Sequence, residues 1–328
     1  MVQLRTSYAQ DLRLVSSWTG WLGVVLLGVG LALMPLLAPR YVVYVATMAA
    51  VHTLVAVGLN LLVGYAGQIS LGHAGFFAVG AYTHGLVLTR LGWGFWPAFA
   101  AAAVVSLLFG YGVGVPALRL SGPYLAVATM AFGLAVHQVL VNWEALSGGR
   151  SGLFLPEVRL LGGSLKDERM LYGVVVAVTV LLVLAAARLV RSYVGRAFVA
   201  IRDSDVAAEL SGVDLTRYKT LAFALSALYT GVAGALLGHV VGFLEPQLFT
   251  LFESVYFLSL VVVGGLASIT GSVLGAVLLT LLPQVLSGVG EALNVLYGAA
   301  VILVLRFEPG GLYARWLKIQ RYWRTWPL

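Results

Sequence analysis

Polar side chains interrupt one of the longest apolar regions of the chain, the stretch NLLVGYAGQISLGHAGFFAVGAYTHG at residues 60–85. Lipid offers such groups no hydrogen-bond partner, so they are expected to face other helices or a passage through the protein. Several of them are uncharged amides and hydroxyls, which suit hydrogen bonding to a small polar molecule. We therefore predict a substrate pathway here, formed by Asn60, Gln68, Ser70, Gly72, His73, Phe76, Phe77, Thr129 and Met130.

The same stretch also has a purely structural interpretation. Small residues recur at nearly helical spacing, which is typical of a face that packs closely against another helix. The glycines before this face mark a point where the chain can break, and irregular backbone at membrane depth either lines a cavity or is buried in protein. The sequence is compatible with both interpretations. The small residues are Ser70, Ala74, Ala78, Ala81 and Gly85, and the glycines are Gly64, Gly67 and Gly72.

The five histidines could carry chemistry of their own, because all of them fall in apolar regions. An ionisable group inside a membrane suggests a proton relay. A neutral imidazole that bonds a neighbouring helix is the alternative. Proton-coupled carriers usually add a carboxylate at mid-membrane, whereas Glu245, Glu253 and Glu291 fall at the ends of the apolar regions. This placement favours the second interpretation for His52, His73, His84, His137 and His239.

Motifs for enzymatic chemistry are missing from the sequence. A phosphate-binding Walker A loop needs a glycine before its lysine, but leucine or tyrosine precedes each of the three lysines, Lys166, Lys219 and Lys318. There is no H-E-x-x-H, no G-x-S-x-G and no cysteine. We expect no catalytic residues, no metal site and no ATPase site on this chain.

The composition predicts that these residues lie in an integral membrane protein. Of the 328 residues, 60% are hydrophobic and only 10% are charged, with a mean hydropathy of +0.96. Continuous apolar runs indicate an all-α polytopic protein with about ten spans (eight to ten) rather than a barrel. The uncertain part is 248–287, which reads as two spans or as one broken helix. The predicted spans are 18–38, 42–63, 70–89, 95–115, 123–142, 171–190, 220–242, 248–264, 271–287 and 292–306.

Positive charge sets the expected orientation, because basic residues concentrate in cytoplasmic loops. Ten spans with both termini inside place most of the 20 lysines and arginines on the cytoplasmic side. The chain then divides into a cytoplasmic segment 1–17, a transmembrane domain 18–306 and a basic cytoplasmic tail 307–328. An external loop at 143–170 and a cytoplasmic loop at 191–219 belong to the transmembrane domain.

The cytoplasmic loop contains a helical pattern. Val199, Val206, Leu210 and Val213 form an amphipathic stripe, and a residue at 203–205 can cap a second helix that Gly212 closes. We predict two short helices over 193–202 and 205–211. Six positive charges in this loop also suit a basic segment that binds lipid headgroups.

Four blocks of sequence resemble the LivM-type permease subunits of branched-chain amino acid ABC importers. They are GLNLLVGYAGQISLGHAGFFAVGAY from Gly58, PALRLSGPYLAVATMAFG from Pro116, GRAFVAIRDSDVAAELSGVDLTRYKTLAFALSA from Gly195 and VVVGGLASITGSVLGAVLL from Val261. The resemblance covers almost all of the chain beyond about residue 40, and FEPGGL at 307–312 is similar to the end of that family.

The resemblance implies a permease of a bacterial or archaeal inner membrane. Its implied partners are a second, LivH-like permease, two cytoplasmic ATP-binding subunits, an external substrate-binding protein and membrane lipid, but no nucleic acid. ATP and Mg would be bound by the partner ATPases, and this chain would hold no cofactor. Related permeases for urea or short amides are one alternative, and a proton-coupled secondary carrier is another.

The resemblance also assigns roles to two loops. Binding-protein docking would fall on Gly148, Gly149 and Arg150 of the external loop, unless that loop is an ordinary solvated one. Coupling to the ATPase would fall on Gly195, Arg196, Ile201, Arg202, Asp203, Ala207, Ala208, Glu209 and Gly212.

Two mutational expectations follow for this coupling segment. Ala208 is expected to be a surface residue packed in an ATPase groove, so Ala208→Trp should spare folding. Arg202 is expected to form an exposed ion pair with only a mild, salt-sensitive effect.

Overall fold

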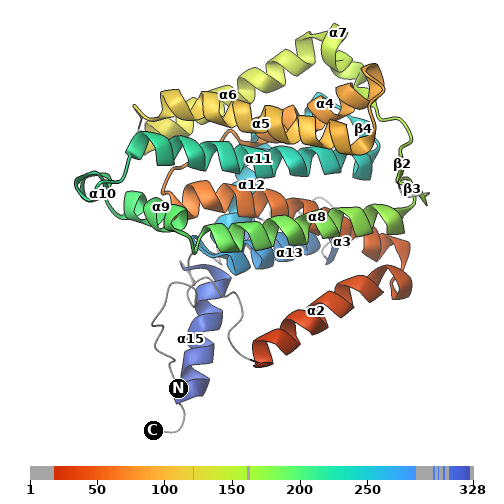
Figure 1. The fold of residues 1–328 in the computed structure, drawn as a ribbon. Coiled ribbons are helices and arrows are strands. Elements are labelled where there is room, and N and C mark those ends of the chain that lie inside the picture. Colours follow the sequence, from red (N-terminus) through yellow and green to blue (C-terminus); the bar gives the residue numbers. More distant parts are fainter. Residues whose placement is uncertain are drawn as a thin grey trace.

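Most of the chain folds into long helices that lie side by side in one bundle (Figure 1). The computed structural model describes residues 18–120, 122–160, 163–285, 298–299, 302, 306 and 310–325. The long elements are α2 (Trp18–Leu37), α3 (Arg40–Asn60), α4 (His73–Arg90), α5 (Phe95–Ala117), α6 (Pro123–Asn142), α8 (Glu168–Leu189), α11 (Leu215–Val241), α12 (Leu251–Gly264), α13 (Ile269–Val285) and α15 (Gly311–Thr325).

Nine of the ten predicted spans correspond to helices, and the tenth, 292–306, lies largely outside the described residues. Five helical segments are long and apolar enough to cross a membrane: Arg40–Tyr65, α5, α6, α8 and α11. The described parts of α2, together with α12 and α13, are shorter apolar helices. These findings confirm the all-α class, while the number of spans and their orientation stay predictions.

Helices α12 and α13 settle the uncertain region at 248–287. They are two helices joined by the turn 265–268, not one broken helix. Their backbones nearly touch, since a Cβ added to Gly264 would lie 2.1 Å from the carbonyl oxygen of Gly271. Glycine at both positions is what lets the two helices pack this closely.

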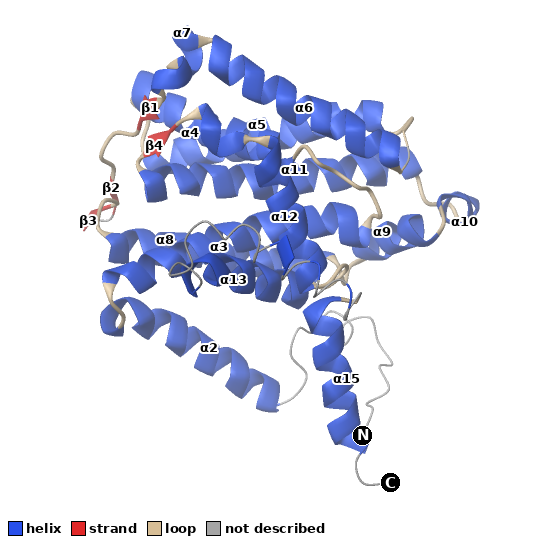
Figure 2. Ribbon diagram, turned by 180° about the vertical axis from the view of Figure 1, so that it is seen from behind, coloured by secondary structure: helices blue, strands red, loops and turns tan. Residues whose placement is uncertain are grey.

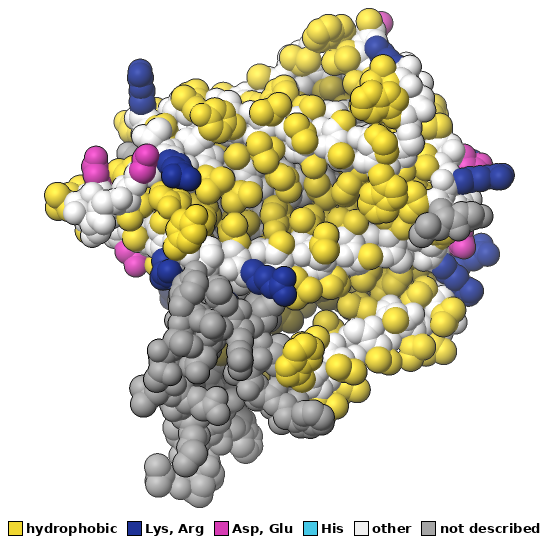
Figure 3. Space-filling view, viewed as in Figure 1, with side chains coloured by type: hydrophobic (Ala, Val, Ile, Leu, Met, Phe, Trp, Pro, Cys, Tyr) yellow, Lys and Arg dark blue, Asp and Glu magenta, His cyan; other side chains and the backbone are white. Residues whose placement is uncertain are grey.

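Helices α3 and α11 form the interior of the bundle. In their most apolar windows 72% and 83% of the residues are buried, against 22–28% for α5, α6 and α8. Hydrophobic side chains cover the long side of the bundle, and charged side chains gather toward its two ends (Figure 3). A lipid environment would match this apolar outer surface.

A close backbone contact of the interior joins α4 to α11. A Cβ on Gly80 would lie 2.0 Å from the carbonyl oxygen of Gly231, and one on Gly234 would lie 2.0 Å from that of Phe77. The small-residue face predicted from the sequence is indeed buried, but Gly80 was not part of it. Glycines on both helices let the backbones touch.

Short elements occupy the two ends of the bundle (Figure 2). Helices α9 (Tyr193–Asp203) and α10 (Asp205–Leu210) lie at one end, which we call the α10 end. At the opposite, α7 end, β1 pairs with β4 and β2 pairs with β3, both antiparallel. The elements of this end are α7 (Glu144–Ser147), η2 (Gly149–Ser151), β1 (Leu153–Phe154), β2 (Arg159–Leu160), β3 (Gly163–Ser164), β4 (Phe243–Leu244) and η3 (Pro246–Phe249).

The predicted external loop 143–170 therefore has structure of its own. Asp167 caps α8 by accepting a hydrogen bond from the backbone N–H of Arg169. Beside this cap, the Ser164 hydroxyl and then Lys166 lower the pKa of the Glu157 carboxyl below its ordinary value. The loop is held by local contacts, so a partner would meet a defined surface.

Candidate functional site

The polar stretch of the sequence begins where α3 loses its regular winding. Residues Leu61–Tyr65 form a π-helix, η1, and the backbone N–H of Ala66 bonds the carbonyl oxygen of Leu61 at 3.2 Å. Residues 66–72 are not helical, and α4 starts at His73. The predicted chain break is confirmed, and π-turns of this kind are frequent at functional sites. Helix α4 thus begins three residues after the predicted start of the span at residue 70.

Asn60 clamps the turn between α12 and α13. Its Nδ2 donates to the carbonyl oxygen of Ser268 at 2.9 Å and to Ser272 Oγ at 2.6 Å. Its Oδ1 accepts from the N–H of Ala267 at 3.0 Å, and Ala267 has a φ of +55°. These bonds hold a non-glycine residue in a left-handed conformation that costs free energy. Asn60 therefore serves helix packing and does not line the crevice described below.

Four of the five histidines, His52, His73, His84 and His239, bond between helices, whereas the Nδ1 of His137 is buried without a hydrogen-bond partner. His73 is fully buried, with Nδ1 3.0 Å from Ser70 Oγ and Nε2 2.7 Å from Ser226 Oγ of α11. His52 Nδ1 lies 2.8 Å from Thr280 Oγ1 of α13. This geometry matches the interpretation as neutral interhelical bonds. In the part of the chain that the structure describes, no three His, Cys, Asp or Glu residues gather to hold a metal ion.

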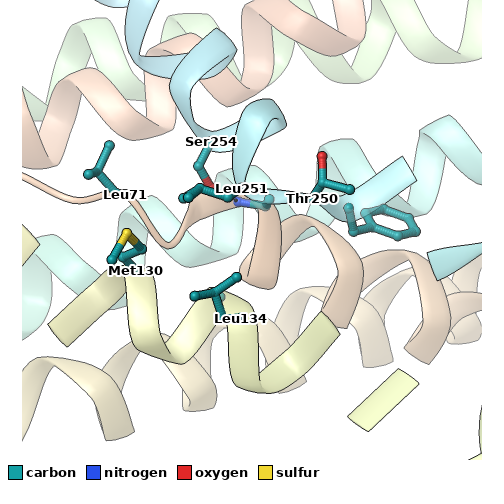
Figure 4. Close-up of a pocket in the computed structure, with 9 residues that line it drawn as sticks. Leu71, Met130, Leu134, Thr250, Leu251 and Ser254 are labelled. Carbon is teal, nitrogen blue, oxygen red and sulfur yellow. Dashed lines mark hydrogen bonds between the residues drawn. The ribbon is translucent and has the colours of Figure 1, made fainter. Parts of the chain in front are cut away.

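A narrow crevice opens where α4, α6 and α12 meet (Figure 4). It is a shallow gap between side chains that leaves no room for a water molecule. Ser254 Oγ of α12 accepts from the N–H of Ala74 at 2.9 Å, so the first turns of α4 and α12 meet here. The lining residues are Leu71, Ala74, Met130, Gly133, Leu134, Phe249, Thr250, Leu251 and Ser254.

The lining combines apolar walls with hydroxyls and two helix N-termini. Thr250 precedes the first residue of α12, and its side chain makes no capping hydrogen bond there. The N-terminal end of a helix carries partial positive charge, which favours an anionic group. The crevice is too narrow to hold a ligand in this conformation, and its chemistry is that of apolar walls beside a polar end.

Only part of the predicted pathway reaches this crevice. Met130 lines it, and Thr129 Oγ1 accepts from the N–H of Leu71 at 3.0 Å beside it. Gly72 packs on the backbone of Thr129, with an added Cβ only 2.2 Å from its carbonyl oxygen. Gln68 is buried, and its Nε2 has no hydrogen-bond partner.

Phe76 and Phe77 belong to the aromatic core instead. The Phe76 ring lies 4.8 Å from that of Phe132, and the Phe77 ring lies 5.2 Å from that of Phe257. The α12 side of the crevice was not predicted from the sequence. The available signal was a pair of hydroxyl residues four apart, Thr250 and Ser254, at the start of an apolar run.

The two predicted helices at the α10 end are confirmed as α9 and α10. Ser192 Oγ caps α9 by accepting from the N–H of Val194, and Ser204 Oγ caps α10 by accepting from that of Ala207. Gly212 follows α10 with a φ of +83°, which favours glycine. The inward face of α9 contains Gly195, Ala197, Phe198 and Ile201, while Arg196, Asp203, Ala207 and Glu209 are exposed.

Arg202 joins α9 to the π-helix. Its Nη1 donates to the carbonyl oxygen of Gly64 at 3.2 Å, and its Nη2 donates to Asp203 Oδ1 at 2.9 Å. Its side chain also covers Gly67, where an added Cβ would lie 2.9 Å from Arg202 Cγ. The predicted exposed ion pair of Arg202 is present, with Asp203, but the guanidinium also holds the backbone at the chain break, which the sequence did not indicate.

The expectation for Ala208 is wrong. Ala208 is only 2% exposed, because α10 turns it toward the chain itself. Replacing it with tryptophan would disturb the loop directly, so that variant cannot separate folding from coupling. Val206 and Leu210 point outward instead, at 69% and 85% exposure. The outer apolar surface of α10 consists of these two side chains.

The predicted docking residues lie at the α7 end. Gly148 and Gly149 have φ values of +79° and +57°, and Arg150 is exposed. Arg90 fixes the adjacent α7 by donating to the carbonyl oxygens of Ala145 and Leu146. Gly149 is buried, so Arg150 is the exposed member of this well-connected turn, and the role of the turn in docking stays a prediction.

Comparison with known proteins gives the relatives of this chain. The family model described as "Branched-chain amino acid transport system / permease component" matches residues 41–305. The high-affinity branched-chain amino acid transport system permease protein LivM of Salmonella typhimurium is 34% identical over 85% of this chain and 71% of its own length. LivM of Escherichia coli K12 is 32% identical over the same shares.

More distant relatives carry a second subunit name. The permease protein LivH of Escherichia coli K12 is 27% identical over 82% of this chain and 93% of its own length. No solved structure matches. The family match covers α3–α13, including both the crevice and the α9–α10 segment.

Proposed function

Because the chain belongs to the branched-chain amino acid transport system permease family, we propose that it is the membrane subunit of an ABC importer for branched-chain amino acids. The match over residues 41–305 is the observation that carries the proposal. It agrees with a chain of apolar helices that has no Walker A lysine. The ATP and Mg would then be bound by separate subunits.

The crevice supports a hydrophobic amino acid as the substrate. Leu71, Met130 and Leu134 offer apolar contacts to an aliphatic side chain, and Thr250 and Ser254 offer hydroxyls. The first turns of α4 and α12 supply partial positive charge for the carboxylate, as broken helices do in other transporters. Movement of α6 or α12 would widen the crevice during transport.

The α10 end would face the ATPase subunits. Val206 and Leu210 form an outward apolar surface on α10, and the capped helices give that surface a fixed shape. Lys219 Nζ bonds Asp205 Oδ2 at 2.6 Å, so α10 is tied to α11. ATPase closure would press on α10 and move α9, and Arg202 would pass that motion to the chain break at Gly64 and Gly67.

The remaining partners would assemble around these two ends. A second, LivH-like permease would complete the pathway, because importers of this kind use two related membrane subunits. A substrate-binding protein would dock at the α7 end near Gly148, Gly149 and Arg150. We place the protein in a bacterial or archaeal inner membrane, with the α10 end in the cytoplasm and the α7 end outside.

Cysteine labelling tests this orientation, since the chain has no native cysteine. Lys166 and Glu209 are exposed at opposite ends of the bundle, so their cysteine variants should preserve the fold. An impermeant maleimide added to right-side-out vesicles is expected to label Lys166→Cys, and Glu209→Cys only after the membrane is opened. Labelling of Glu209→Cys in intact vesicles, with Lys166→Cys labelled only after the membrane is opened, would refute the orientation.

Transport by purified subunits tests the function. Liposomes that contain both permeases and both ATPases, supplied with ATP and the binding protein, are expected to accumulate leucine. Valine and isoleucine should compete, because the apolar walls accept any branched aliphatic side chain, whereas urea should not. This chain alone should not accumulate leucine. Uptake by the chain alone would falsify the importer proposal, and competition by urea but not by valine would overturn the substrate class.

A further inference from the structure

The C-terminal helix α15 has two chemically different faces. Apolar residues at helical spacing form one face, and basic residues fall on the other. No Asp or Glu occurs in the sequence between Gly310 and Thr325. By their spacing in the sequence the apolar residues are Leu312, Trp316, Ile319 and Trp323, and the basic residues are Arg315, Lys318, Arg321 and Arg324.

The start of α15 is fixed to the α12–α13 turn. Gly311 has a φ of +77°, and a Cβ added to it would lie 2.5 Å from Gly265 Cα. Gly265 belongs to the turn that Asn60 clamps, and Leu312 packs against the core. The beginning of α15 is therefore anchored to the same end of the bundle as α9.

From this anchor α15 runs across the long helices instead of along them, and the views from the front and from behind agree (Figures 1 and 2). If the long helices cross a membrane, α15 lies parallel to its surface at the level where those helices end. Trp316 is 60% exposed on α15, and Arg315 and Lys318 are exposed beside it. An exposed tryptophan on a basic amphipathic helix is typical of a membrane-surface helix.

We propose that α15 lies in the cytoplasmic interface of the membrane, with Trp316 inserted among the acyl chains and the basic residues bound to anionic phospholipid headgroups. This goes beyond the transport function and rests on the proposed orientation of the α10 end. Tryptophan prefers the interface because its ring is apolar and its N–H is polar. A nearby Lys or Arg favours binding to an anionic membrane surface about fivefold.

Depth-dependent quenching on the full chain tests the proposal. Trp316→Cys and Lys318→Cys place one fluorescent label on each face of α15, and no other cysteine competes for the label. The protein is reconstituted in vesicles of phosphatidylcholine mixed with phosphatidylglycerol. Nitroxide-bearing lipid should quench the label at 316, and aqueous iodide should quench the label at 318 more strongly.

A charge variant tests the headgroup contact. Arg315→Gln, Arg321→Gln and Arg324→Gln, combined in the Trp316→Cys chain, should lower lipid quenching and raise iodide quenching at 316. In vesicles of phosphatidylcholine alone, the Trp316→Cys chain with its basic residues intact should show the same loss of lipid quenching at 316. Equal quenching of both labels by iodide would overturn the proposal. Protection of the label at 316 from iodide that does not depend on lipid charge would also overturn it, because a helix covered by protein would give that result. None of these readouts requires transport, so they remain informative if the proposed substrate or partners are wrong.

Discussion

Replacing Gly80 with leucine is expected to abolish accumulation of the folded protein. The added side chain would start 2.0 Å from the carbonyl oxygen of Gly231, inside the contact between α4 and α11. That neighbour is backbone in the middle of a helix, so it cannot move aside as a flexible side chain could. Overpacking of a core commonly costs about 1–3 kcal/mol, and we expect this position to exceed that range.

The surroundings of Gly231 do not allow its backbone to move away from a larger side chain at position 80. A Cβ on Gly231 would lie 1.9 Å from Ser106 Oγ of α5, so three helices meet at this point. Separating α4 from α11 would also disturb the bond between His73 Nε2 and Ser226 Oγ. The effect should therefore spread from the packing contact to the polar residues near the crevice.

The measurement is the fraction of detergent-solubilised protein that remains monodisperse after heating. Gly112→Leu is the matched control, because Gly112 is also a helix glycine but an added Cβ there meets nothing within 4 Å. Gly112→Leu should behave like the unaltered chain. If Gly80→Leu accumulated and survived heating as well as Gly112→Leu, the close packing of α4 on α11 would be refuted.

Replacing Arg202 with alanine is expected to uncouple transport from ATP hydrolysis while the complex still assembles. Arg202 bonds the carbonyl oxygen of Gly64 and covers Gly67, so it is the side chain that ties α9 to the chain break. A hydrogen bond from a charged donor contributes roughly 1.5–3 kcal/mol. The Arg202 side chain is 35% exposed, so we use the lower limit, which corresponds to about a tenfold loss of leucine uptake.

Two variants make the result specific. Arg217→Ala removes the same charge from the same loop, at an exposed position on α11, and should retain uptake. Arg202→Lys keeps the charge but loses the planar guanidinium that bonds Gly64 and Asp203 at the same time. Its leucine uptake should fall between that of Arg202→Ala and that of Arg217→Ala. Uptake, ATP hydrolysis and subunit association are measured on the reconstituted complex. Equal uptake by Arg202→Ala and Arg217→Ala would show that Arg202 does not transmit the motion.

Several features of this protein could be predicted from the sequence because they depend on neighbouring residues alone. Apolar composition and run length placed nine helices close to their observed bounds. The helices α9 and α10 followed from an amphipathic pattern with Ser204 and Gly212 at the right positions. The break after Gly64 followed from glycines and polar residues in an apolar run.

The partners of the polar residues could not be predicted in this way. Asn60 met the expected criteria for a pathway residue, yet it bonds residues 267–272 and lies in a helix contact. Ala208 lay in a segment expected to meet a partner, yet it is buried in its own chain. Thr250 and Ser254 are not among the predicted pathway residues, but they line the crevice.

The sequence by itself thus determined the class of protein, its helices and their caps, because hydropathy and helix periodicity are local properties of the chain. Only the tertiary structure decided which side chains meet. The Arg202–Gly64 contact joins residues 138 positions apart, and the Ala74–Ser254 contact joins residues 180 apart. An apolar run allows many rotations about the helix axis, and close packing of glycine-rich faces at Gly80 and Gly231 selects one of them.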